Sequence, residues 1–243
     1  MKLFLATSDN SSHILPSFAW LLDKYVPEID EVIVLGYGTF PELPERYTTV
    51  SLAPKQRSAD EWSTRLFEYF GSIKDEYVLF GLDDFLPTRP MDIELLLKVT
   101  KYMVKNNAMR YELGVGHSWH QYTLPVDDLI YQYGQNSLYR ISTQFSVWNR
   151  NYLLKHLAGK LDAGDFEKRG SEQAMNDNQL IIATRGMIAW DWVQAGALSS
   201  RHPNKINVLG INHEDVEQMI ELGLLERDKL QLGMNIENNP KYK

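Results

Sequence analysis

The sequence predicts an α/β fold in which helices flank an open, mostly parallel sheet of the Rossmann type. Two short apolar runs, residues 3–6 (LFLA) and 31–36 (EVIVLG), are typical of buried parallel strands. Residues 14–25, between them, carry apolar side chains at helical spacing. A strand, a helix and a second strand in this order are the repeating unit of a parallel sheet.

The same alternation continues through the first 115 residues. Residues 60–73 repeat the helical pattern, and residues 76–81 (EYVLFG) predict a third buried strand. This strand ends at Asp83 and Asp84, and residues 91–106 then predict a long amphipathic helix. Because open α/β sheets bind ligands beyond the carboxyl ends of their strands, we expect the acidic pair to lie at a ligand site.

The pattern is less regular after residue 115. We expect a loop over residues 122–134, a strand over 138–148, helices over 149–157 and 171–184, and a strand over 206–211 before a last helix. The sequence has no repeat, low-complexity tract or linker. We therefore expect one domain over residues 1–243, divided at most into two halves near residue 115.

Composition excludes several classes of protein. The chain has 25 Lys and Arg against 32 Asp and Glu, a net charge of −7, and no basic run, so duplex nucleic acid is not an expected partner. The absence of cysteine excludes disulfides, zinc–thiolate sites and thiol nucleophiles. The first apolar run is too short for a signal peptide, and no segment reaches the roughly 20 apolar residues of a transmembrane helix. We expect a cytoplasmic protein.

Familiar cofactor and hydrolase motifs are also missing. Gly36 and Gly38 begin a dinucleotide fingerprint, but Pro41 stands where its third glycine belongs. There is no Walker loop, no Gly-X-Ser-X-Gly elbow and no His-Glu-X-X-His motif. Neither an NAD site nor the usual hydrolase and metalloprotease sites are expected.

Asp83 and Asp84 follow a run of apolar and aromatic residues. Two carboxylates at the exit of a buried strand repel each other and lose solvation, so a fold that keeps them together usually offers a cation or hydrogen-bond donors. Carboxylate oxygens suit Mg²⁺ or Mn²⁺, which retain waters and bridge to substrate phosphates. The alternative is a loop in which one Asp caps the next turn and the other is solvated.

Three segments carry a resemblance to a known family. Residues 77–87 (YVLFGLDDFLP), with the long helix after them, resemble the central segment of GT-A-type glycosyltransferases of bacterial polysaccharide gene clusters. Residues 139–149 (YRISTQFSVWN) resemble the acceptor-side segment of this group, and residues 165–167 (DFE) resemble its Trp-X-Phe-Glu element. The resemblance implies a GT-A-like fold, with residues 1–115 binding a nucleotide sugar and residues 116–243 forming the acceptor side.

The resemblance also implies a reaction. A sugar would pass from a UDP-, GDP- or TDP-linked donor to a hydroxyl group of a glycan, a lipid-linked glycan, a protein or a modified base. Mn²⁺ or Mg²⁺ would bind the donor diphosphate at the acidic pair, with Asp84 as the preferred metal ligand and Asp83 nearer the sugar or ribose. One candidate base and no nucleophile pair favour an inverting single displacement.

In the resemblance, Glu167 corresponds to the acidic residue with which such glycosyltransferases would deprotonate the acceptor hydroxyl. A base is needed there because a neutral alcohol is a poor nucleophile. Gly164 stands where the family often has Trp, so Asp165 is the alternative base. Lys168 and Arg169 follow directly, and an exposed acidic loop explains the same residues.

Further donor-site candidates are scattered along the chain. Thr7 and Asp9 follow the first strand, where such folds bind base and ribose, although loop capping also explains them. Arg65 could meet a phosphate through its planar guanidinium, or lie on a helix surface. Arg201 and Lys205 could neutralise the departing diphosphate, or belong to a solvated basic loop.

Trp148, Trp190 and Trp192 could form aromatic walls against the sugar rings of an acceptor, although large aromatics more often pack in cores. His213, between a predicted strand and a helix, could be an additional metal or diphosphate ligand, or a surface residue.

Two other functions remain open. A nucleotidyltransferase would use the same acidic strand end for Mg²⁺, but it normally has a glycine-rich, basic loop near the first strand, and residues 7–13 lack Gly, Lys and Arg. A binding or assembly protein could keep the fold without turnover.

Overall fold

The computed structural model of the chain describes residues 1–113, 123–126, 128–184, 206–207 and 211–231. The strands of its main sheet are β1 (Lys2–Ala6), β2 (Glu31–Tyr37), β3 (Tyr47–Ala53), β4 (Tyr77–Leu82), β5 (Arg110–Glu112), β6 (Thr123–Pro125), β7 (Ile130–Tyr133), β8 (Ser146–Asn149) and β9 (Ile181–Thr184). Strands β10 (Ile206–Asn207) and β11 (Leu230–Gln231) form a separate pair. The α-helices are α1 (Leu15–Tyr25), α2 (Glu61–Ser72), α3 (Ile93–Lys105), α4 (Arg150–Leu157), α5 (Ala163–Ala174) and α6 (His213–Glu221); the 3-10 helices are η1 (Ser12–Ile14) and η2 (Arg227–Lys229).

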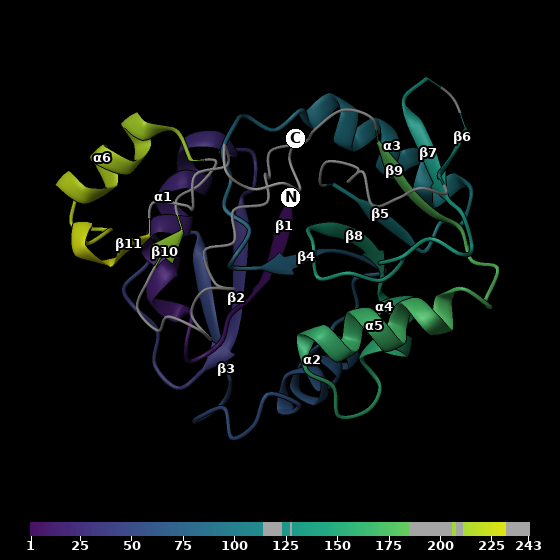
Figure 1. Ribbon diagram of the computed structural model, residues 1–243, viewed down its shortest axis with the longest axis horizontal. Helices are drawn as coiled ribbons and strands as arrows, with labels where there is room; N and C mark the ends of the chain where they lie inside the picture. The colour runs from purple at the N-terminus through teal and green to yellow at the C-terminus, as the bar shows by residue number, and fades with distance from the viewer. Residues whose placement is uncertain (114–122, 127, 185–205, 208–210, 232–243) are drawn as a thin grey trace.

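The predicted fold class is confirmed. The main sheet has nine strands in the order β3-β2-β1-β4-β8-β5-β9-β7-β6, with helices on both sides (Figure 1). The first four strands in this order are parallel to one another, as their uninterrupted apolar runs predict for β1, β2 and β4. Antiparallel pairings join β4 and β5 to β8, and β7 to β6 and β9.

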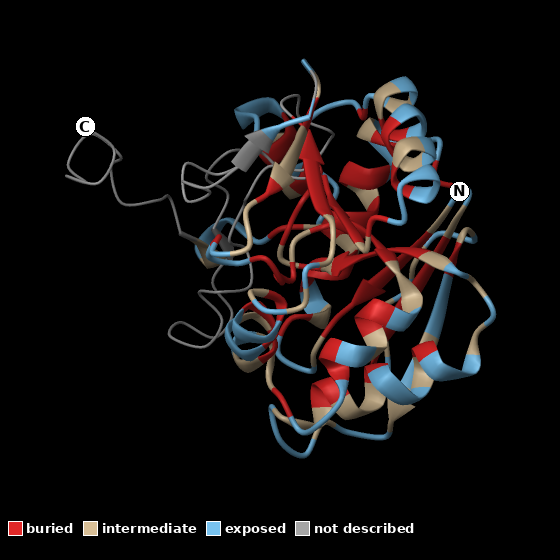
Figure 2. Ribbon diagram, turned by 90° about the vertical axis from the view of Figure 1, so that its right-hand side faces the viewer, coloured by how far each residue is buried: buried red, intermediate tan, exposed pale blue. Residues whose placement is uncertain are grey.

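Strand β1 lies in the middle of the parallel half and supplies both cores. Leu3 and Leu5 pack into one cluster with α1 and α3, while Phe4 and Ala6 pack into another with α2, α4 and α5. Successive side chains of a strand point to opposite faces of a sheet, so one apolar run serves two helical layers. Figure 2 shows the buried strands between helices whose outer faces are exposed. Among the described residues, no helix is both long enough and apolar enough to cross a bilayer.

Several elements of the second half differ from the sequence-based prediction. Residues 171–184, expected to form one helix, contain the end of α5 and all of β9. Helix α5 begins earlier, because the Asp162 carboxylate caps it by accepting the Asp165 amide at 2.7 Å. Residues 122–134, expected to form a loop, contain the antiparallel strands β6 and β7. Within residues 138–148, the strand begins only at Ser146.

The junction between β4 and the segment before β8 leaves no room for a side chain at Gly81. A Cβ atom there would lie 2.5 to 2.6 Å from the ring of Phe145, which is buried. We expect Gly81→Ala to lower the free energy of unfolding by about 1–3 kcal/mol, because the ring has to move within a packed core. Urea unfolding measures the change, and Gly71→Ala on α2, where no atom lies within 4 Å, is the control. Equal stability of the two variants would contradict the expected clash.

Candidate functional site

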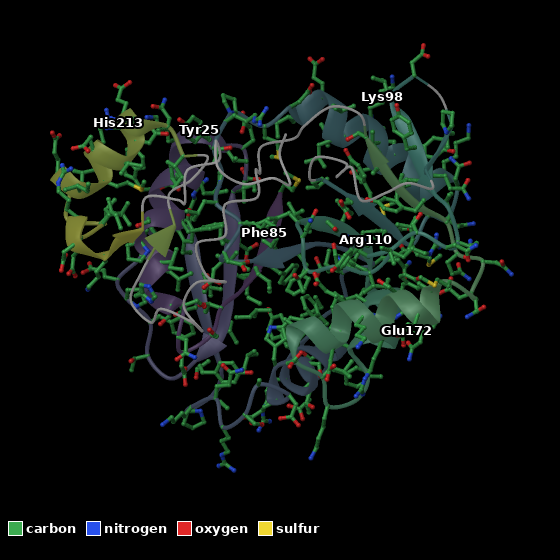
Figure 3. The ribbon with its side chains drawn as sticks, viewed as in Figure 1. Tyr25, Phe85, Lys98, Arg110, Glu172 and His213 are labelled. Carbon is green, nitrogen blue, oxygen red and sulfur yellow. The ribbon has the colours of Figure 1, made fainter. Side chains whose placement is uncertain are left out.

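A cavity of about 880 Å³ lies at the carboxyl ends of β1 and β4. Its wall is formed by residues 7–11 after β1, residues 82–84 at the end of β4, residues 55–59 between β3 and α2, and residues 162–164 at the start of α5. Parallel pairing of β1 with β4 brings the first two segments together. Phe85, next to the acidic pair, lies near the centre of the molecule in Figure 3.

Asp83 is held by the protein itself. Its side chain is 4% exposed, and its Oδ2 accepts a hydrogen bond of 2.5 Å from the Thr7 hydroxyl. Burial raises the pKa of Asp83 to about 6, while hydrogen bonds from Thr7 and Ser11 act in the opposite direction. Thr7 lies in the cavity wall, where the sequence predicts it.

The Asp84 carboxylate has fewer hydrogen-bond donors around it than that of Asp83. Its Oδ1 is buried and has no hydrogen-bond partner among the described residues. Burial raises the pKa of Asp84 to about 7, and the negative charges of Asp83 and Glu167 act in the same direction. Buried polar atoms are normally paired, so this oxygen indicates a missing partner, and a cation is the partner that an acidic pair favours.

The residues present fit a divalent cation that is shared with a ligand. Two neighbouring carboxylates supply hard oxygen atoms, and within the described part of the chain no group of three acidic, His or Cys side chains could enclose an ion. Mg²⁺ is usually held by one or two carboxylates, with water and substrate phosphates completing its coordination. The arrangement therefore suits a cation site that is completed by a phosphate-bearing ligand.

The structure does not bring His213 to this site. The residue lies on α6, at the left-hand edge of the molecule in Figure 3 and away from Phe85 at its centre, and its side chain is 89% exposed. Its Nε2 lies 3.9 Å from the Glu217 carboxylate on the same helix. The prediction of a late histidine ligand is wrong for His213, because α6 packs against the outer side of α1 and not at the ends of the strands.

Two basic residues in the cavity wall were missed. Lys55 and Arg57 lie in the exposed loop between β3 and α2, and neither side chain forms an ion pair with a described residue. The Gln56 amide donates to the Asp9 carboxylate at 3.0 Å, and the Arg57 amide donates to Glu61 at 2.9 Å, so the loop backbone is anchored on both sides. A Lys-X-Arg pattern between a strand and a helix is the sequence signal for this loop.

The two candidate bases lie on α5 and differ in their surroundings. Glu167 Oε1 accepts hydrogen bonds from the Thr143 amide at 2.7 Å and hydroxyl at 2.8 Å, and its charge acts on Asp84. The Asp165 side chain is 44% exposed and lies 3.8 Å from Arg169. The structure therefore brings Glu167 towards the acidic pair and leaves Asp165 at the surface.

Arg65 and Trp148 do not line the cavity. The Arg65 guanidinium lies 3.0 Å from both Glu61 and Glu68 on its own helix, so its charge is already compensated. The Trp148 ring is fully buried in the core beside Phe166. The predicted stacking role is wrong for Trp148, because a ring without exposed surface offers no face to a sugar. Four other predicted residues lie outside the described residues: Trp190, Trp192, Arg201 and Lys205.

Comparison with known proteins identifies the fold. No protein-family model and no curated protein sequence matches the chain. Crystal structures of S. aureus TarS 1-349, alone and in complex with UDP, are similar to it, with TM-scores of 0.50 and 0.51 at 12% identity. Each similarity covers 78% of this chain and 59% of the TarS chain, so the present chain spans less than two thirds of that structure.

A mannosyltransferase, PcManGT from Pyrobaculum calidifontis in complex with GDP-Man and Mn²⁺, gives a TM-score of 0.49 at 12% identity, over 82% of this chain and 59% of that chain. The likeness to TarS shows that the chain has a GT-A-type glycosyltransferase fold.

Proposed function

We propose that the chain is a glycosyltransferase that moves a sugar from a nucleotide-diphosphate sugar to a hydroxyl group, with a divalent cation at Asp83 and Asp84. The observation that carries the proposal is the buried Oδ1 of Asp84, which has no hydrogen-bond partner among the described residues and lies in a cavity also lined by the basic residues Lys55 and Arg57. Paired carboxylates and nearby basic side chains together suit a metal-bound diphosphate.

The donor fits the cavity in size and charge. A volume of about 880 Å³ lies within the range of about 300–1,000 Å³ that small-molecule sites occupy. TarS binds UDP in one of its structures, which supports a nucleoside diphosphate as the leaving group here. UDP, GDP and TDP donors all remain in the proposal.

The chain's own residues account for the remaining chemistry. Asp84 and Asp83 hold Mn²⁺ or Mg²⁺, which when bound offsets the charge that develops on the diphosphate. Glu167 takes the proton of the acceptor hydroxyl, and the acceptor oxygen forms a bond to the anomeric carbon of the donor sugar. The bond from that carbon to the diphosphate oxygen breaks, and the nucleoside diphosphate leaves. Asp165 lies near Arg169, which leaves Glu167 as the single base. A single displacement by the acceptor inverts the configuration at the anomeric carbon.

Donor turnover tests this function. Purified protein is incubated with UDP-, GDP- and TDP-sugars in Mn²⁺ or Mg²⁺, and release of nucleoside diphosphate is measured with and without EDTA. We expect metal-dependent release from one class of donor, and the anomeric configuration of the product, determined by NMR, to be inverted. No release from any donor, together with unchanged donor affinity in Asp84→Ala, contradicts the proposal. Pyrophosphate release from a nucleoside triphosphate would instead identify a nucleotidyltransferase.

Lys55→Ala and Arg57→Ala are each expected to weaken binding of the nucleoside diphosphate by at least about tenfold, because a hydrogen bond to a charged group contributes about 1.5–3 kcal/mol. Raising the salt concentration should reduce the difference in Kd between each variant and the wild type, because salt screens the charges of exposed side chains. Isothermal titration calorimetry with Mn²⁺ present measures Kd. Lys98→Ala, an exposed lysine on α3, is the control. If Lys98→Ala raised Kd as much as Lys55→Ala, binding would depend on the net charge of the protein and not on a contact with Lys55.

A further inference from the structure

The segment of residues 140–143 packs against α5 through two alternate residues, Ile141 and Thr143. The amide and hydroxyl of Thr143 both donate to Glu167 Oε1, at 2.7 and 2.8 Å. The Ser171 hydroxyl accepts from the Ile141 amide and donates to the Ile141 carbonyl, both at 3.1 Å. Gly170 allows this approach, because a Cβ atom there would lie 2.7 Å from the Ile141 side chain. The helix that carries Glu167 is therefore packed tightly on this segment.

Arg110 of β5 holds the other residues of the same segment. Its side chain is fully buried, and it donates to the Arg140 carbonyl at 2.8 Å and to the Ser142 hydroxyl at 2.6 Å. Its remaining donors meet Ser146 at 3.0 Å and Glu112 at 2.7 Å. The guanidinium is thus fixed on both sides and can act as a rigid support for residues 140 and 142.

These contacts determine which oxygen of Glu167 is free. Both hydrogen bonds from Thr143 go to Oε1, and Oε2 forms no hydrogen bond with a described residue. A general base has to present one lone pair in a defined direction, and a misplacement of about 1 Å can cost about 10² in rate.

We propose that Thr143 is a positioning residue that fixes the Glu167 carboxylate by Oε1 and leaves Oε2 to take the acceptor proton, with Arg110 supporting the segment from behind. This inference rests on the proposed function, because it needs Glu167 as the base. Thr143 acts through Glu167 and not on the substrate itself.

Thr143→Val tests the proposal, since it removes the hydroxyl and keeps the amide. We expect kcat to fall about tenfold with the donor KM within about twofold. Thr143→Ser, which retains a hydroxyl, should restore most of the activity, and Ser142→Ala should show a smaller loss confined to kcat. In a Glu167→Ala background Thr143→Val should have no further effect, because no carboxylate remains to be oriented. The control is Thr64→Val on α2, which removes a hydroxyl that donates to the Gly159 carbonyl.

Three results would overturn the proposal. Thr143→Val could lower kcat as much in the Glu167→Ala background as in the wild type, it could raise the donor KM with kcat unchanged, or Thr143→Ser could be as inactive as Thr143→Val. If the wild type transfers no sugar, the proposed function fails and the contact is tested alone by amide hydrogen exchange. The Thr143 amide should exchange at least about tenfold faster in Glu167→Ala, because one hydrogen bond is lost. Unchanged exchange would exclude the contact and with it the positioning role.

Discussion

Asp84→Asn is expected to lower kcat/KM for sugar transfer by at least about 10³, because in the proposed mechanism the carboxylate charge of Asp84 holds the cation against the donor diphosphate. Release of nucleoside diphosphate during a Mn²⁺ titration measures the loss, and added Mn²⁺ should not restore the rate. The control is Asp128→Asn, which neutralises an exposed carboxylate between β6 and β7. Full activity of Asp84→Asn would remove the acidic pair from the mechanism.

The same substitution is expected to stabilise the metal-free chain. Burial, with Asp83 beside it, raises the pKa of Asp84 from 3.8 to about 7, so the folded chain keeps a proton that the unfolded chain releases. This contribution is fully present below about pH 4 and is lost as the pH rises through about 7. At pH 8 in EDTA, Asp84→Asn should therefore gain about 1–3 kcal/mol in free energy of unfolding. Urea unfolding at pH 5 and pH 8 measures the gain, and a less stable variant at pH 8 would contradict it.

Glu167→Gln is expected to lower kcat by about 10²–10⁴, the contribution of a general base, with the donor KM little changed. The amide keeps the shape of the side chain and its contact with Thr143, so the loss reports proton transfer and not a rearranged helix. Steady-state transfer kinetics with saturating acceptor measure both constants.

Asp165→Asn is the matched control for Glu167→Gln. It neutralises a carboxylate on the same helix, two residues away, that lies near Arg169 and is partly exposed. Its kcat should stay within about twofold of the wild type. The assignment would be reversed if Asp165→Asn lost the activity and Glu167→Gln kept it, and the alternative base of the sequence-based prediction would then be correct.

The first half of the fold could be predicted because its pattern is local. Strands β1, β2 and β4 are apolar runs that need no knowledge of their neighbours, and α1, α2 and α3 show apolar residues at helical spacing. Strand β3 was missed because it lies at the edge of the sheet, where three of its seven residues are exposed and polar.

The second half was harder because short apolar runs do not reveal their partners. Residues 181–184 (IIAT) suit a helix end or a buried strand equally well, and only pairing with β5 and β7 makes them β9. Strands β6 and β7 likewise depend on each other and on β9. Propensity is a weak guide where tertiary pairing decides the conformation.

The sequence by itself determined that Asp83 and Asp84 end a buried strand, because hydropathy and strand length are local properties. Only the tertiary structure shows how the two carboxylates differ in hydrogen bonding: Thr7, 76 residues away, donates to Asp83, whereas Asp84 Oδ1 has no hydrogen-bond partner within the described part of the chain. It also distinguished Glu167 from Asp165, since residues two apart on a helix point in different directions. Both outcomes depend on contacts between distant segments, which the pairing of β1 with β4 and the packing of α5 bring together.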